Sequence, residues 1–133
     1  MSADREDQAP AAQYRITVEG RFSAVHQLRL PNGGLESLHG HDWIVRATFS
    51  APQLDSLGMV VDFHIAENSI RLMLAPLNHS NLNEHSAFRD CNPTAEVVAE
   101  YVFGALLREG LPVHEVAVTE APGCTASFGP NVN

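Results

Sequence analysis

Three of the seven histidines fall where their imidazoles can converge on one point. His26 ends a stretch in which apolar and polar residues alternate, and His39 and His41 begin a second stretch of the same kind. Alternation with a period of two is typical of a half-buried strand, so an antiparallel pair of these strands would gather the three side chains on one face. Three neutral imidazoles without a nearby cysteine suit zinc, and three protein ligands leave one coordination position open for chemistry.

A second interpretation needs no metal. Taken alone, His39-Gly40-His41 is more often the polar end of a loop, and His26 alone is more often a hydrogen-bonded core histidine. The shared register of all three side chains favours the metal site over this alternative.

The elements that must position these histidines follow the order ββααββ. In chain order we expect a strand over 14–26, a strand over 39–49, a helix with Asp62 as N-cap that stops at Pro76, a helix with Asn92 as N-cap and Pro93 in its first turn, and strands over 113–120 and 124–128. No internal repeat and no domain boundary interrupts this order. The pattern predicts a single α+β domain.

Composition narrows the class of protein further. The chain has 133 residues, and its eight basic residues, all arginines, stand against sixteen acidic ones for a net charge of −8. This balance argues against nucleic acid as a partner, and no apolar run approaches the roughly 18 residues that cross a bilayer. Two cysteines, Cys91 and Cys124, make no disulfide framework and indicate a cytoplasmic domain in reducing conditions. We expect a disordered tail over residues 1–12 and one domain over residues 13–133.

Several segments together resemble a known enzyme family. Residues 22–26 and 38–41 are similar to the zinc motifs of the 6-pyruvoyltetrahydropterin synthase family, which includes the bacterial 6-carboxytetrahydropterin synthases of queuosine biosynthesis. The likeness continues, in the right order and spacing, through residues 60–63, 77–83, 92–96 and 119–120. It therefore covers nearly everything after the expected tail.

The resemblance implies the tunnelling fold, a four-stranded antiparallel sheet with two helices on one face. Subunits of this family form trimers that stack into hexamers, with active sites at subunit interfaces. The implied cofactor is Zn²⁺, held by His26, His39 and His41, and the implied substrate is the pterin 7,8-dihydroneopterin triphosphate. Glu120 matches the glutamate that anchors the pterin ring, and Thr94 matches a second pterin contact, although a role at the start of a helix explains Thr94 equally well.

The chain departs from the family pattern before the second zinc motif. The usual catalytic cysteine stands four residues before the first histidine of the His-x-His pair, and here that position is Leu35. The next residue is Glu36, so the segment resembles the Glu-x-x-His-Gly-His variant, which cleaves the side chain to 6-hydroxymethyl-7,8-dihydropterin, a folate precursor. A carboxylate can take a proton next to a zinc-polarised group as a thiolate can, so Glu36 is the expected general base. The alternative for Glu36 is a solvated charge in a loop.

A second departure is Asn78 before His79, where the family commonly has aspartate. Aspartate orients an imidazole and stabilises its cation, whereas asparagine can only orient it. His79 would then be a weaker acid or base, with Glu36 carrying more of the proton transfer, or the activity would be impaired.

Three functions stay open at this point. The first is a zinc-dependent lyase that cleaves the pterin side chain, and the second is 6-carboxytetrahydropterin or 6-pyruvoyltetrahydropterin synthase activity, against which Leu35 counts. The third is a weakly active or non-catalytic pterin-binding or zinc-binding paralogue, which Asn78 favours. Unphosphorylated dihydroneopterin also stays open as the substrate, because a triphosphate should meet basic residues and this chain has only eight.

Overall fold

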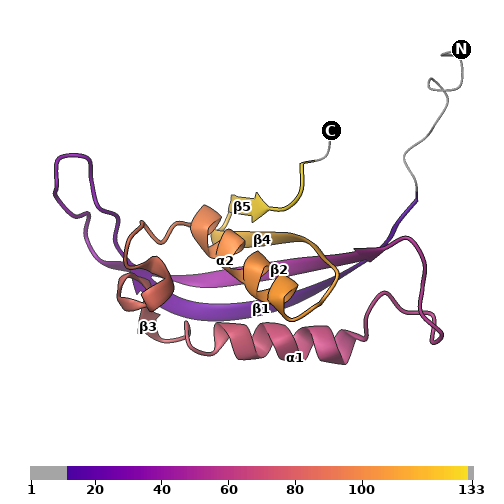
Figure 1. Cartoon of the computed structure of the whole chain (residues 1–133). Coiled ribbons are helices and arrows are strands. Elements are labelled where there is room, and N and C mark those ends of the chain that lie inside the picture. The colour runs from indigo at the N-terminus through magenta and orange to yellow at the C-terminus, as the bar shows by residue number, and fades with distance from the viewer. Residues whose placement is uncertain (1–11, 132–133) are drawn as a thin grey trace, which may run out of the picture.

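One five-stranded sheet organises the fold, which a computed structural model describes for residues 12–131. The predicted tail therefore lies, apart from Ala12, outside the described residues. The elements are β1 (Tyr14–His26), β2 (His39–Ala51), α1 (Phe63–Leu74), β3 (Ser80–Asn81), the 3₁₀ turns η2 (Leu82–Glu84) and η3 (Ser86–Phe88), α2 (Ala95–Arg108), β4 (Val113–Ala121) and β5 (Cys124–Phe128). The strand order is β3-β1-β2-β4-β5. Figure 1 shows the long β1–β2 ribbon with the two helices packed over it.

The α+β class and the order of the predicted elements are confirmed, and the sheet differs in one strand. The sequence predicts four antiparallel strands, whereas the structure adds the two-residue β3, which runs parallel to β1 along its outer edge. The polar stretch after α1 gave no strand signal because two residues are too few for an alternating pattern.

The start of α2 is a second correction. Thr94, not Asn92, is the N-cap, because its side-chain oxygen accepts a hydrogen bond from the N–H of Val97 at 3.2 Å. The Asn92 side chain is used elsewhere, since its oxygen accepts from the N–H of Arg29 and its amide donates to the Arg29 carbonyl. Both residues are good caps by type, and this long-range contact decides between them.

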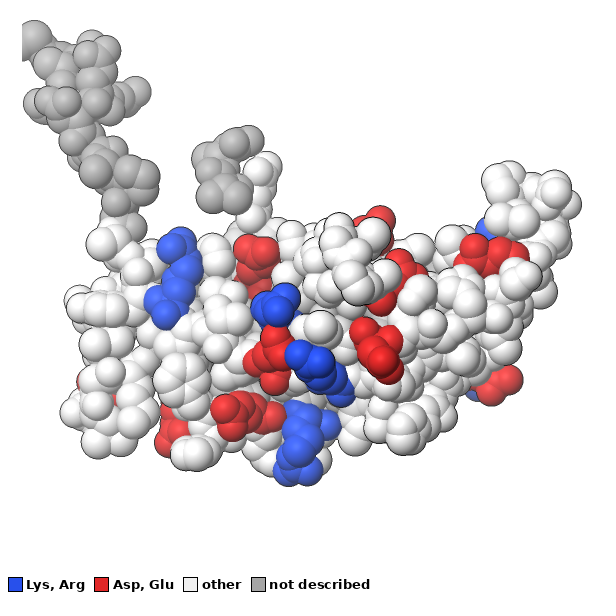
Figure 2. All heavy atoms as spheres, turned by 180° about the vertical axis from the view of Figure 1, so that it is seen from behind, with Lys and Arg blue, Asp and Glu red and all other residues white. Residues whose placement is uncertain are grey.

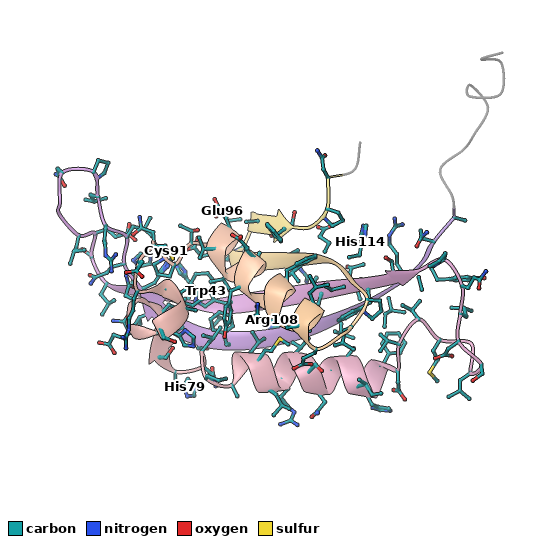
Figure 3. All side chains as sticks on the ribbon, viewed as in Figure 1. Trp43, His79, Cys91, Glu96, Arg108 and His114 are labelled. Carbon is teal, nitrogen blue, oxygen red and sulfur yellow. The ribbon has the colours of Figure 1, made fainter. Side chains whose placement is uncertain are left out.

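The core lies between the sheet and the helices. Alternate residues of the strands face it, including Val18 and Phe22 of β1, and α1 and α2 cover them with buried aliphatic side chains. Trp43 of β2 is fully buried there, where its ring stacks on Phe22 and its Nε1 donates to the carbonyl of Ala24 (Figure 3). The three histidines occupy the last core-facing position of β1 and the first two core-facing positions of β2. These positions lie at the same end of the sheet.

The opposite face of the sheet carries charges. Glu19 of β1 pairs with Arg21 at 3.2 Å and with Arg46 of β2 at 3.1 Å. Viewed from behind, acidic and basic side chains lie interspersed (Figure 2). Among the described residues, no helix is long and apolar enough to cross a membrane.

Candidate metal centre

The register of the β1–β2 pair brings the three histidines together. His26 lies directly opposite His39, and His41 lies opposite Ala24, two positions further along. All three side chains are therefore on the core-facing side of the sheet. The centroid of the His26 ring lies 4.6 Å from that of His39 and 5.3 Å from that of His41, and the His39 and His41 centroids are 4.9 Å apart.

Backbone carbonyls orient two of these imidazoles. The Nδ1 of His26 lies 2.8 Å from the carbonyl oxygen of Pro93, and the Nδ1 of His39 lies 2.8 Å from that of Ser37. A carbonyl can only accept, so each Nδ1 carries the hydrogen and each neutral ring presents a bare lone pair at Nε2. Metal-binding histidines are held in this way, with the second nitrogen donating to a carbonyl.

The Nε2 of His26 is the atom that most clearly requires a partner. The side chain is buried, and this nitrogen has no hydrogen-bond partner among the described residues. The Glu120 Oε1 lies only 2.8 Å away, but its direction does not meet hydrogen-bond geometry. A buried lone pair beside a carboxylate oxygen is unfavourable unless a cation balances it. The donor set therefore fits a metal ion.

Glu120 of β4 completes the donor cluster. One ligand atom from each of His26, His39, His41 and Glu120 lies within 4.8 Å of the others, which is a grouping that can hold a metal ion. The Glu120 Oε1 is also 3.4 Å from the Nε2 of His41. Imidazole and carboxylate donors without thiolate are compatible with zinc.

The electrostatics of the cluster favour neutral imidazole at His41. Burial lowers the pKa of His41, and repulsion from any charge on His26 and His39 lowers it further, while the carboxylates of Glu120 and Glu36 act in the opposite direction. Lowering the pKa of a histidine keeps its ring neutral at physiological pH. The neutral ring is the form that binds metals.

Glu36 lies next to the donor cluster. Its Oε1 is 3.8 Å from the Nδ1 of His39 and accepts a hydrogen bond from the N–H of Leu28 at 3.0 Å. An isolated bridge between Arg29 and Leu35 closes the loop that precedes Glu36, and the Glu36 N–H donates to the Leu28 carbonyl. Glu36 is thus held at a defined place beside His39 rather than extended freely into solvent, while Leu35 is exposed.

Asn78 and His79 lie along the outer edge of β1, the edge that does not pair with β2. The Asn78 side-chain oxygen accepts from the N–H of Ser23 at 2.9 Å, and the N–H of His79 donates to the Ser23 carbonyl at 2.6 Å. His79 has a φ of 58°, the single positive value among the described non-glycine residues, and it lies at the end of α1 (Figure 3). A residue held in this sparsely populated conformation is often functional.

One cavity lies between His79 and the donor cluster. It has a volume of about 580 Å³, and its lining includes His41, His79, Ser23 and Asp42. The Ser23 hydroxyl donates to Asp42 at 2.5 Å. Within the described residues, this cavity is lined both by His79 and by His41 of the donor cluster.

Sequence reasoning named every member of the donor cluster but assigned Glu120 to the pterin alone. It also missed the carbonyls of Pro93 and Ser37, because backbone groups leave no signal in residue types. Asp42 was missed because an exposed aspartate in an alternating strand is an ordinary solvent-facing residue.

Comparisons with known proteins agree on one family. The model of the family described as 6-pyruvoyl tetrahydropterin synthase matches residues 15–131. An Archaeoglobus fulgidus protein named as a putative 6-carboxy-5,6,7,8-tetrahydropterin synthase is 30% identical over 105 residues, which cover 79% of this chain and 86% of that protein.

Solved structures share the fold. The 6-pyruvoyl tetrahydropterin synthase of Caenorhabditis elegans superposes with a TM-score of 0.76 at 20% identity, covering 93% of this chain and all of that one. The Plasmodium vivax 6-pyruvoyltetrahydropterin synthase, in a variant whose catalytic glutamate is replaced by alanine, superposes with a TM-score of 0.72 at 21% identity, covering 91% of this chain and 99% of that one. The tunnelling fold expected from the sequence is confirmed.

Proposed function

The chain belongs to the 6-pyruvoyl tetrahydropterin synthase family, and on this premise we propose that it is a zinc-dependent lyase acting on the side chain of 7,8-dihydroneopterin triphosphate. The proposed product is 6-hydroxymethyl-7,8-dihydropterin, a folate precursor. One observation carries this choice: the carboxylate of Glu36 lies beside the His39 ring, 3.8 Å from its Nδ1 and not at the metal-facing Nε2, and Leu35 stands where the family's cysteine would be.

Each residue of the site has a proposed role. His26, His39 and His41 would hold the zinc ion, which when bound supplies a Lewis acid that polarises the substrate hydroxyls. Glu36 is the general base that takes a proton from the polarised side chain, and the hydrogen bond from Leu28 holds its carboxylate in place. His79 assists proton transfer from the cavity that it shares with His41.

The N-cap residue of α2 and a residue of β4 would hold the pterin ring. Glu120 can accept two parallel hydrogen bonds from the exocyclic amine and the ring N–H of a pterin. The oxygen of Thr94 accepts from Val97, so its hydroxyl hydrogen stays available to donate to the ring. Asn78 supports His79 indirectly, by tying the preceding backbone to Ser23.

The substrate phosphates need a cation near this site. Arg29 lies three residues after His26, at the base of the loop that precedes Glu36, and its guanidinium donates to the Arg89 carbonyl at 2.7 Å. Arg46, by contrast, is paired with Glu19 on the other face of the sheet. Arg29 is therefore the proposed phosphate contact, and its loss should weaken binding of the triphosphate more than that of dihydroneopterin.

We also propose a trimer or hexamer with active sites between subunits, located in the cytoplasm. The outer edge of β1 is paired with β3 only at Ala24 and Val25, and β5 pairs with β4 alone in the described chain, so both sheet edges can pair with other subunits. The thiols of Cys91 and Cys124 are free, which supports a reducing compartment. Light scattering of the purified protein measures the subunit number.

Product analysis tests the reaction. The zinc-loaded protein is incubated with 7,8-dihydroneopterin triphosphate, and the products are identified by mass spectrometry. We expect 6-hydroxymethyl-7,8-dihydropterin. A 6-carboxy-tetrahydropterin or 6-pyruvoyl-tetrahydropterin product would assign the enzyme to the synthase branch instead. Intact substrate that stays bound to the protein would indicate a binding paralogue.

A pair of variants tests the proposed base. Glu36→Gln keeps the acceptor for the Leu28 N–H but cannot take a proton, so turnover should be abolished while the zinc content is unchanged. Glu67→Gln is the matched control, because Glu67 is an exposed glutamate of α1. Turnover that survives in Glu36→Gln would exclude Glu36 as the base.

A further inference from the structure

Glu120 stands at an irregularity in the sheet that aims its side chain. In the β4–β5 pair, Thr119 lies opposite Thr125 and Ala121 lies opposite Cys124, so Glu120 is an extra residue without a partner. A bulge of this kind redirects one side chain and is common next to functional sites. Here the redirected carboxylate lies against His26 and His41.

The distance between Glu120 and His41 fits a shared coordination shell. Tetrahedral zinc with bonds of about 2.0–2.2 Å keeps its ligand atoms roughly 3.3–3.6 Å apart. The Oε1 of Glu120 is 3.4 Å from the Nε2 of His41, which lies in this range. It is 2.8 Å from the Nε2 of His26 without a hydrogen bond between them, so these two atoms would have to move apart to share a metal ion. One carboxylate oxygen thus faces the ligating atoms of two histidines, as a fourth metal ligand would.

Glu120 also has space to move into. Its side chain is partly exposed and lines a cavity of about 400 Å³ with Glu96 and Cys124, and a second of about 520 Å³ with His41 and Thr119. His26, by contrast, is buried and fixed by Pro93. Of these two donors, Glu120 is the one that can leave the cluster without disturbing the core.

We infer that Glu120 is the fourth metal ligand in the substrate-free protein and that the substrate displaces its carboxylate. This inference rests on the proposed metal centre. A substrate hydroxyl oxygen takes the coordination position, no covalent bond of the substrate changes in this exchange, and the released carboxylate becomes the acceptor for the pterin ring. Four protein ligands would then fill the coordination positions of the metal until a pterin binds.

Metal affinity tests the inference without measuring turnover. Zinc dissociation constants are measured by competition with a chromophoric chelator, and the visible spectrum of the Co²⁺-substituted protein reports the ligand set. We expect Glu120→Gln to weaken zinc binding by about tenfold or more and to change the Co²⁺ spectrum. Glu96→Gln removes a carboxylate from the same cavity but not from the cluster, so it should bind zinc like the wild type.

A second variant separates coordination from simple charge attraction. Glu120→Asp keeps the charge but draws the carboxylate back by one methylene, so it should also weaken zinc binding. Wild-type affinity in Glu120→Asp together with weak binding in Glu120→Gln would assign the effect to charge and overturn the inference. So would a wild-type spectrum and affinity in Glu120→Gln.

The exchange itself is tested with the ligand. Adding 7,8-dihydroneopterin to the Co²⁺ protein should shift the wild-type spectrum toward that of Glu120→Gln, and an unchanged spectrum with bound pterin would contradict displacement. His39→Ala separates this inference from the proposed function. If His39→Ala retains full zinc affinity, the metal centre itself is wrong; if it loses zinc while Glu120→Gln does not, only the role of Glu120 is wrong.

Discussion

The side-chain oxygen of Asn78 accepts a hydrogen bond from the backbone N–H of Ser23 at 2.9 Å, across a sequence separation of 55 residues. The bond ties the segment after α1 to the edge of β1. The N–H of His79 donates to the carbonyl of the same serine. Both backbone polar groups of Ser23, its N–H and its carbonyl, are therefore hydrogen-bonded to residues 78 and 79, and these bonds fix His79 beside the sheet.

This relationship predicts the effect of removing the Asn78 amide. Asn78→Ala leaves the Ser23 N–H without its partner at a half-buried position, so we expect a loss of about 1 kcal/mol in the free energy of unfolding. Asn78→Asp is the matched control, because its carboxylate can still accept from Ser23. Urea denaturation measures both variants. Equal stability of Asn78→Ala and the wild type would show that water replaces the amide at no cost.

The three proposed ligands should differ in their structural importance. His26→Ala and His39→Ala are both expected to lose the metal, but His26 is buried and bonded to Pro93, whereas His39 is half-exposed. In the metal-free state, His26→Ala should therefore be less stable than His39→Ala by about 2 kcal/mol, from the lost packing and the unpaired carbonyl. Metal analysis and chemical denaturation test the pair. Equal stabilities would mean that the Pro93 carbonyl is solvated when His26 is removed.

Metal removal should lower the thermal stability. A ligand that binds only the folded chain stabilises it by about 2.7 kcal/mol at a free concentration 100 times its dissociation constant. We expect a chelator to lower Tm by several degrees and added zinc to restore it. His39→Ala is the control, since its Tm should respond to neither addition. A wild-type Tm that changes neither with the chelator nor with added zinc would contradict the metal centre.

Gly20 should tolerate no side chain. A Cβ at this position would lie 2.5 Å from Cγ2 of Ile70 and 2.8 Å from Cδ1 of Leu74, both in buried side chains of α1. Gly20→Ala must displace the Ile70 and Leu74 side chains, at a cost of about 1–3 kcal/mol measured by urea denaturation. In Gly40→Ala, a matched strand glycine, the nearest atom would be at 3.4 Å, so its stability should change by less than about 1 kcal/mol. Similar losses in both variants would contradict the steric explanation.

The sequence by itself determined the faces of the strands. Because side chains in a strand alternate between two faces, the positions of His26, His39 and His41 within their alternating stretches already placed the three imidazoles together. This is local information, repeated every two residues, and one hairpin loop suffices to bring the two strands side by side. The same local periodicity explains why the element order and the α+β class were predicted correctly.

Only the tertiary structure decided the contacts that join distant segments. By residue type, Asn92 is as good an N-cap for α2 as Thr94. The Asn92 side chain bonds to Arg29 instead, so Thr94 is the cap. The direction of the Glu120 side chain depends on a bulge between β4 and β5, which is a property of two paired backbones and not of either residue pattern. The hydrogen bonds from His26 to Pro93 and from Ser23 to Asn78 likewise join residues more than fifty positions apart. Such pairings depend on how the whole chain packs, and no local pattern records them.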